Sequence, residues 1–166
     1  MEWTTHALSG IVAGYAVSGG DWKGAVVGGI AGVIPDLDEH KSKFGKLFFP
    51  VSYIINKTFG HRTLTHSLLF VVIIGSVLMP FFDSWVWLSA SAGILAHIVG
   101  DMLTGKVKFL YPYQKSIGLS VGQFTFVLMD RGTRTLLALI VLYKCYGYLK
   151  IFNYIKGAVN QWKMYQ

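Results

Sequence analysis

Residues 60–67, with the sequence GHRTLTHS, place two histidines and an arginine directly before a long apolar run at residues 68–82. Imidazoles bind metal ions and transfer protons near neutral pH, and arginine presents a planar set of donors that suits phosphate or carboxylate. The chain has five histidines, and four of them adjoin or lie within apolar segments. Because a polar group at membrane depth is retained mainly where it has a partner and a task, this motif indicates a functional site.

The composition indicates a membrane protein. The 166 residues are 53% hydrophobic and only 14% charged, whereas about a quarter of an ordinary soluble domain is charged. We therefore predict a single all-α domain over residues 1–166, a polytopic helical bundle with four to six membrane-embedded helices. Its core motifs lie within residues 6–112 and its C-terminal helices within residues 117–166. The net charge of +7 comes without aromatics interleaved along a basic stripe, so we expect an anionic membrane surface or an anionic phosphorylated substrate rather than nucleic acid.

The first two apolar segments, residues 7–18 and 24–34, are shorter than the roughly 20 residues of a membrane span. Each carries glycines four residues apart, which lets helix backbones approach closely in lipid. These glycines are Gly10 and Gly14 in the first segment, and Gly24, Gly28 and Gly32 in the second. We predict a tight helical hairpin, followed by spans at residues 68–82, 87–103 and 135–152, with residues 117–129 left unassigned.

The distribution of basic residues predicts the orientation. If the first four spans cross in turn, one side holds most of the cations: Lys41, Lys43, Lys46, Lys57, Arg62, Lys106, Lys108 and Lys115. Loops rich in Lys and Arg face the cytoplasm. We expect a multi-pass protein of a bacterial or archaeal-type inner (cytoplasmic) membrane, with this side in the cytoplasm.

The same alternation of direction brings distant polar residues to one face. Six residues at the corresponding helix ends are candidate metal ligands: His6, Asp36, Asp38, His66, His97 and Asp101. His97 and Asp101 are four residues apart and share a helix face. His61 and His66 are five apart, about 140° around a helix, so we place His66 at the first helical turn and His61 in the preceding loop.

Mixed imidazole and carboxylate ligands suit a divalent metal, with zinc expected and manganese or iron as alternatives. One to three ions are compatible with six ligands, and two ions could hold both oxygens of a phosphoryl displacement. We assign His61, Arg62 and Asp38 to the catalytic set. Arg62 would grip a phosphate oxygen, and either His61 or His40 would protonate the leaving group.

The motifs resemble one known family, the YdjM-like inner-membrane proteins, which are identified as metal-dependent hydrolases. The matching features cover residues 6–112: His6 before a glycine-rich helix, Pro35-Asp36-Leu37-Asp38, His61-Arg62 through Thr65-His66-Ser67, His97 through Asp101 to Thr104, and Tyr111-Pro112. The resemblance implies a helical membrane hydrolase with a distant similarity to zinc phospholipase C and P1 nuclease, which are helical phosphoesterases with clustered zinc.

We therefore expect a metal-dependent hydrolase that cleaves a phosphoester of a lipid or of a membrane-proximal substrate. One alternative is a transporter that passes metal ions or protons through the same cluster. Another is a non-catalytic scaffold with a structural metal, which would have a closed coordination sphere. No HExxH motif of a metalloprotease is present. The sequence leaves the substrate and the oligomeric state open.

Overall fold

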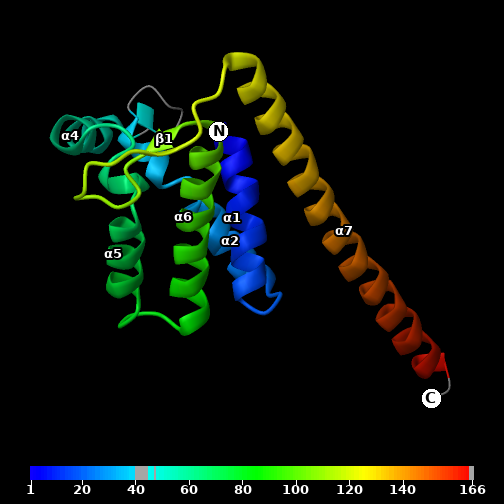
Figure 1. Ribbon diagram of the computed structural model, residues 1–166. Helices are drawn as coiled ribbons and strands as arrows, with labels where there is room; N and C mark the ends of the chain where they lie inside the picture. Colours follow the sequence, from blue (N-terminus) through cyan, green and yellow to red (C-terminus); the bar gives the residue numbers. More distant parts are fainter. Residues whose placement is uncertain (40–44, 47, 165–166) are drawn as a thin grey trace.

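The computed structural model describes residues 1–39, 45–46 and 48–164, with side chains at all of these except 51 and 157–164. It is a mostly helical structure (Figure 1). In chain order the elements are α1 (Trp3–Val17), α2 (Trp22–Ala31), the 3-10 turn η1 (Pro35–Asp38), α4 (Phe49–Phe59), the 3-10 turn η2 (Leu64–His66), α5 (Leu68–Leu78), α6 (Ser84–Thr104), β1 (Lys106–Val107), β2 (Ile117–Gly118) and α7 (Gln123–Met164). His40 and the lysines at 41 and 43 lie outside the described residues.

The predicted hairpin of α1 and α2 is confirmed. Gly19 and Gly20 form its turn with φ angles of 72° and 90°, a region that glycine adopts without steric strain. Asp21 then caps α2, its carboxylate accepting a hydrogen bond of 2.9 Å from the backbone N–H of Lys23. Since the cap satisfies one of the free donors of the first turn, α2 can begin immediately after the turn.

Glycines allow α1, α2 and α6 to pack backbone against backbone. A Cβ atom added at Gly10, Gly14 or Gly93 would overlap backbone atoms of α2. Gly28 lies at the centre of this crossing, since its own added Cβ would overlap the backbone of α1 and its carbonyl meets Gly93 of α6. The predicted small-residue interface is therefore confirmed, and it fixes the positions of α1 and α6 against α2.

The interior is unusually polar. Ile94 and Ile98 of α6 are fully buried, but among the described residues the buried polar side chains outnumber the buried apolar ones, while many large apolar side chains face outward. Two segments are long and apolar enough to cross a membrane, α6 and residues Gln123–Lys156 of α7. The expected four to six membrane helices are not confirmed, because α1, α2 and α5 have only 15, 10 and 11 residues. The expected all-α fold also gains one short antiparallel pair, β1 with β2.

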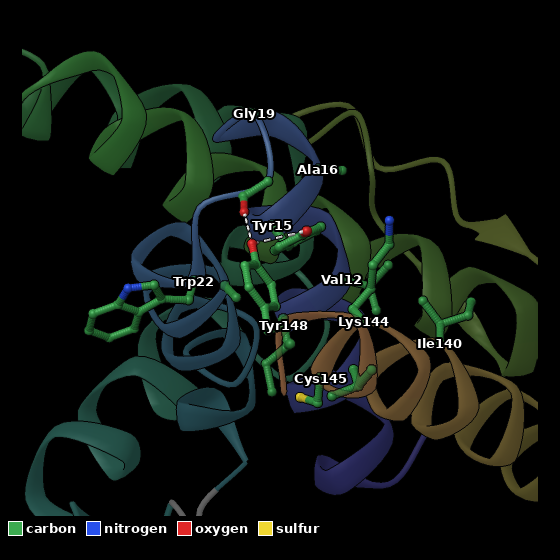
Figure 2. Close-up of a pocket in the computed structure, with 13 residues that line it drawn as sticks. Val12, Tyr15, Ala16, Gly19, Trp22, Ile140, Lys144, Cys145 and Tyr148 are labelled. Carbon is green, nitrogen blue, oxygen red and sulfur yellow. Dashed lines mark hydrogen bonds between the residues drawn. The ribbon is translucent and has the colours of Figure 1, made fainter. Parts of the chain in front are cut away.

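α7 differs most from expectation. The unassigned residues 117–129 and the expected span 135–152 largely merge into one helix of 42 residues, because no proline interrupts the chain after Pro112. Its first turns contact the start of α1, where Arg134 pairs with Glu2 at 2.7 Å. Further along, the Tyr148 hydroxyl donates to the carbonyl of Gly20 at 2.7 Å. A crevice lies between these two contacts, with Val12 and Lys144 on its walls (Figure 2).

Candidate metal centre

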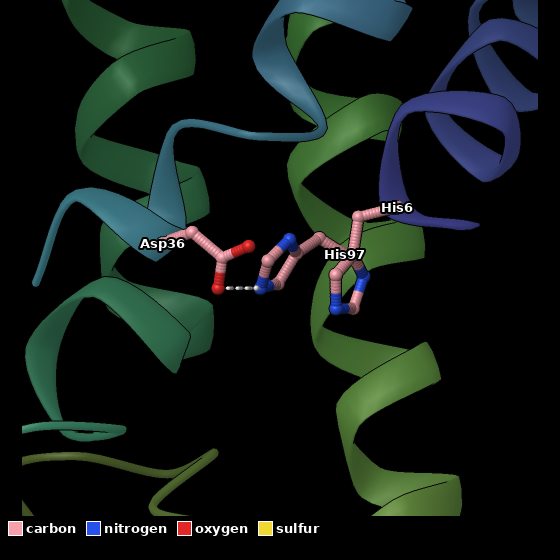
Figure 3. Close-up of side chains that lie close together, drawn as sticks. All are labelled: His6, Asp36 and His97. Carbon is pink, nitrogen blue, oxygen red and sulfur yellow. Dashed lines mark ion pairs between the residues drawn. The ribbon is translucent and has the colours of Figure 1, made fainter. Parts of the chain in front are cut away.

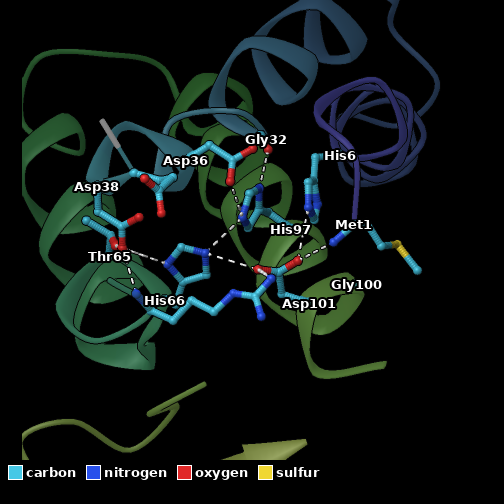
Figure 4. Close-up of polar contacts among 12 residues, drawn as sticks. Met1, His6, Gly32, Asp36, Asp38, Thr65, His66, His97, Gly100 and Asp101 are labelled. Atoms are coloured by element: carbon cyan, nitrogen blue, oxygen red, sulfur yellow. Dashed lines mark hydrogen bonds and ion pairs between the residues drawn. The ribbon is translucent and has the colours of Figure 1, made fainter. Parts of the chain in front are cut away.

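Four elements bring imidazoles and carboxylates to one end of the helical bundle, as the sequence predicts. His6 comes from the first turns of α1, Asp36 from η1, His66 from η2, and His97 with Asp101 from the second half of α6 (Figure 4). Ligand atoms of His66, His97 and Asp101 all lie within 4.8 Å of one another, and so do those of His6, Asp36 and His97. The two groups share His97, which is fully buried.

Hydrogen bonding fixes the His97 ring with one nitrogen directed at the cluster. Nδ1 lies 2.7 Å from the backbone carbonyl of Gly32. A carbonyl oxygen only accepts, so Nδ1 carries the proton and Nε2 presents a lone pair. Nε2 is 3.1 Å from Nε2 of His66. A partner that holds the other ring nitrogen in this way is typical of metal-bound histidines.

The ring of His66 is held in the same way, through a hydrogen bond to Nδ1. The Thr65 hydroxyl donates to Oδ2 of Asp38 at 2.6 Å, so its oxygen is left to accept from Nδ1 of His66 at 3.0 Å. Asp38 Oδ2 itself lies 3.2 Å from that nitrogen. Burial disfavours the charged ring, but hydrogen bonds to Asp101 and Asp38 outweigh it and raise the pKa of His66 to about 9. A metal ion at Nε2 would replace the proton that this nitrogen holds.

The ring of His6 is buried between His97 and Asp101. Its ring stacks on His97 with centroids 3.6 Å apart, and it lies beside Gly100, where an added Cβ would be 3.5 Å from Cε1 of the ring. Nε2 lies 3.1 Å from Oδ1 of Asp101, yet neither ring nitrogen has a hydrogen-bond partner of acceptable geometry in the described part of the chain. Because unpaired buried polar atoms are rare in folded proteins, this ring fits the position of a ligand.

Two carboxylates complete the cluster. Oδ1 of Asp36 is 3.7 Å from Nε2 of His97 (Figure 3). Burial raises the pKa of Asp36, although His6 opposes the shift. Asp101 is more enclosed, with Oδ1 accepting from the amino group of Met1 at 2.6 Å and Oδ2 lying 3.3 Å from Nε2 of His66. Asp36 retains 16% side-chain exposure against 2% for Asp101, so the open side of the cluster is at Asp36.

These separations fit a zinc-type ion. Ligands at about 2.0–2.1 Å from a tetrahedral zinc lie about 3.3 Å from one another, and the observed separations among His66, His97 and Asp101 or Asp36 are 3.1, 3.3 and 3.7 Å. Since Nδ1 of His97 is already bonded to Gly32, only Nε2 can serve as a ligand. The two groups therefore cannot each hold a separate ion through His97.

Asp38 occupies a different position from the other predicted ligands. It is fully buried, and Oδ1 pairs with Nδ1 of His61 at 2.8 Å while Oδ2 accepts from the backbone N–H of Arg62 at 2.9 Å. Burial alone would raise its pKa, but hydrogen bonds from His61, His66 and Thr65 hold the pKa of Asp38 well below its usual range. Asp38 belongs to neither of the two ligand groups and instead orients the residues around them.

Arg62 adjoins the cluster on a constrained backbone. Its φ of 58° is uncommon for a residue with a Cβ. Two hydrogen bonds hold this backbone in place. The N–H of Arg62 donates to Asp38, and its carbonyl accepts from the backbone N–H of Lys108 at 3.1 Å. Nη2 lies 3.0 Å from Oδ2 of Asp101, and a side chain at Gly105 would collide with the guanidinium. Arg62 and His61 remain partly exposed, at 29% and 36%.

One functional neighbour escaped the sequence analysis. Asp130 of α7 is buried, and Oδ1 accepts from the backbone N–H of Glu2 at 2.8 Å and from the Thr5 hydroxyl at 2.9 Å. It thereby caps the start of α1, next to His6. The only sequence signal is an acidic residue between two apolar runs. The residues that it bonds, Glu2 and Thr5, are more than a hundred residues away in the chain. Asp130 therefore fixes the start of α1, which carries His6.

Comparison with known proteins relates the chain to one family. The family model described as the YdjM inner membrane protein matches residues 1–155. The protein YvsG of Bacillus subtilis is 30% identical over 161 residues, covering 92% of this chain and 98% of that protein. The inner membrane protein YdjM of Escherichia coli is 36% identical over 102 residues, covering 56% of this chain and 52% of that protein; YdjM of Shigella flexneri matches equally. No solved structure matches.

Proposed function

This chain belongs to the YdjM family of inner membrane proteins, and we propose that it is a single-ion, zinc-dependent hydrolase of phosphoesters at the membrane surface. One observation carries the proposal. His66 and His97 each have Nδ1 bonded to a fixed partner and direct Nε2 at the other, while the ring of His6 beside them has no hydrogen-bond partner of acceptable geometry among the described residues. This is the donor set of a histidine-rich metal site.

Five side chains would hold the ion: His66, His97 and Asp101 as the buried set, with His6 and Asp36 completing it. A divalent ion there would act as a Lewis acid on a phosphoryl oxygen and supply a nucleophile at neutral pH. The partly exposed Asp36 lies where a substrate group would enter. Asp38 is not a ligand in this proposal, because it belongs to neither group of side chains whose ligand atoms lie within reach of a common ion.

His61 and Arg62 are the residues best placed to act on a substrate. Asp38 holds Nδ1 of His61 and so leaves Nε2 to carry and release a proton, as a general acid for the leaving group requires. Arg62 Nη2 contacts Asp101, and the remaining donors of its planar fork suit a non-bridging phosphate oxygen. Both residues lie on the loop between α4 and η2, which is open to solvent on one side.

The position relative to the membrane limits the range of substrates in this proposal. Lys106 and Lys108 follow α6 near Arg62, and basic loops favour the cytoplasmic side. We therefore place the centre at the cytoplasmic face, with α6 and α7 crossing the bilayer in a multi-pass arrangement. A phosphate group of a lipid or of a lipid-linked molecule would reach the cluster there without leaving the interface, and cationic residues would attract it.

The test uses the purified full chain in nanodiscs, loaded with zinc and offered phospholipids, isoprenyl phosphates and nucleotides, each with and without a chelator. We expect release of phosphate or head group that the chelator abolishes. His61→Ala and Arg62→Ala should retain the ion and lose turnover, whereas His97→Ala should lose both. Lys23→Ala, at an exposed position of α2 on the side opposite the cluster, is the matched control and should behave as wild type.

The two alternative functions give different results in the same preparation. A transporter would move zinc or protons across liposomes without releasing product. A scaffold would retain zinc and hydrolyse none of the compounds. Either result would overturn the enzymatic proposal, and absence of bound metal from the wild-type chain would overturn the metal centre itself.

A further inference from the structure

A second candidate site lies at the other end of α1, between α1 and α7. The crevice has a volume of about 570 Å³, within the range of small-molecule sites. Its walls are apolar, with Val12 and Ala16 from α1 and Ile140 from α7 (Figure 2). No residue of the metal cluster lines it, so this crevice is independent of the proposed hydrolytic function.

One end of the crevice is polar. The Tyr148 hydroxyl donates to the carbonyl of Gly20 at 2.7 Å, and the hydroxyls of Tyr15 and Tyr148 are 3.3 Å apart. Because the Tyr148 proton is already donated to Gly20, Tyr15 is the donor between the two hydroxyls. These bonds join α7 to the turn of the α1–α2 hairpin and close that end of the crevice.

Lys144 provides a cation at this end. It is the only formally charged residue between Arg134 and Lys150, and a lysine within an apolar membrane helix is costly unless it meets a counter-charge. The Lys144 ammonium lies 5.7 Å from the centre of the Tyr15 ring, and in the described part of the chain no carboxylate is within ion-pair distance of it. The crevice therefore combines apolar walls with one cation that forms no ion pair among the described residues.

Lys144 lies toward the end of α1 that is opposite to the metal cluster. Arg134 contacts Glu2 at one end of α1, and Tyr148 contacts Gly20 at the other. At about 1.5 Å per residue, these contacts are about 21 Å apart along α7, and Lys144 lies about 6 Å, roughly one turn, before Tyr148. A long lysine side chain can extend toward the interface from such a depth. The cation therefore lies near the end of α1 that is far from the metal cluster.

We propose that this crevice binds an anionic phospholipid, with one acyl chain between α1 and α7 and the phosphate at the Lys144 ammonium. A lipid is the occupant that fits, because the crevice opens beside a 34-residue apolar segment of α7, none of whose best spanning window is buried. Apolar walls with a cation at one end complement an amphiphile of negative charge. The lipid would fill the space between α7 and the helical hairpin and so fix the angle of α7.

Native mass spectrometry of the full chain, with equal amounts of phosphatidylglycerol and phosphatidylcholine, tests the proposal. We expect one phosphatidylglycerol to remain bound at collision energies that remove other lipid, with at least a tenfold preference over phosphatidylcholine. Lys144→Gln should remove that preference. Ala16→Phe, which fills the crevice from an exposed position on α1, should remove the bound lipid altogether.

Two control variants separate the crevice from general effects. Lys156→Gln removes a cation further along α7, and Val17→Phe adds the same ring beside the crevice without lining it; both should retain phosphatidylglycerol as wild type does. Circular dichroism should show equal helicity for all variants. Equal retention of the two lipids by the wild type, or unchanged phosphatidylglycerol binding in Lys144→Gln or Ala16→Phe, would overturn the proposal.

Discussion

Gly28→Ala tests whether backbone packing between α1 and α2 supports the metal centre. An added Cβ would lie 2.7 Å from Cα and 3.0 Å from N of Gly14, whereas unstrained contacts between carbons are about 3.5–4.0 Å. Backbone atoms cannot rotate away as a side chain can, so the two helices must separate. Overpacking of this kind costs about 3 kcal/mol at the upper end of its usual range, and the better helix propensity of alanine offsets about 1 kcal/mol.

We therefore expect Gly28→Ala to lower the free energy of unfolding by about 2 kcal/mol. Unfolding by SDS in mixed micelles, followed by far-ultraviolet circular dichroism, measures it. Gly132→Ala is the matched control: apart from the backbone of its own helix, no atom of the described residues lies within 4 Å of the added Cβ, so alanine should stabilise α7 by up to about 1 kcal/mol. If Gly28→Ala were as stable as wild type, the close helix crossing would be refuted.

Two further variants test the residues that position the ligands. Asp38→Asn should lower zinc affinity by about 10–100-fold, as loss of an outer partner of a metal-bound histidine does. Asp83→Asn, at an exposed position where the side chain makes no cap, should leave the affinity unchanged. Competition with a chromophoric chelator measures both affinities, and equal values would contradict the role assigned to Asp38. Asp130→Ala should lower the free energy of unfolding by about 1–3 kcal/mol, because the buried donors of Glu2 and Thr5 lose their acceptor. SDS unfolding measures this effect, Asp130→Asn should restore part of it, and no difference between the two variants would argue against the cap.

The sequence predicts the meeting of five of the six candidate ligands. His6, Asp36, His66, His97 and Asp101 are far apart in the chain, but the alternating direction of the helices requires their ends to adjoin, and the structure brings them together. The glycine spacing likewise predicted the hairpin interface, because a four-residue period leaves one flat face on a helix.

Other features depended on geometry that residue spacing does not contain. The role of Asp38 follows from how η1 and η2 direct its two oxygens at His61, Arg62 and Thr65, which no spacing rule predicts. The expected span count relied on apolar runs, yet α5 ends at Leu78, before the end of its run at Phe82. The similarity to zinc phospholipase C and P1 nuclease stays a prediction, as does each assignment of a metal ligand.

The most direct test of the metal centre is the metal content of the purified chain combined with X-ray absorption at the zinc edge. We predict one zinc per chain, with nitrogen and oxygen ligands at about 2.0–2.1 Å, more than one imidazole in the coordination sphere, and loss of the ion in His97→Ala. A wild-type chain that binds no stoichiometric metal, or a His97→Ala chain that retains the same ion with the same spectrum, would contradict the account.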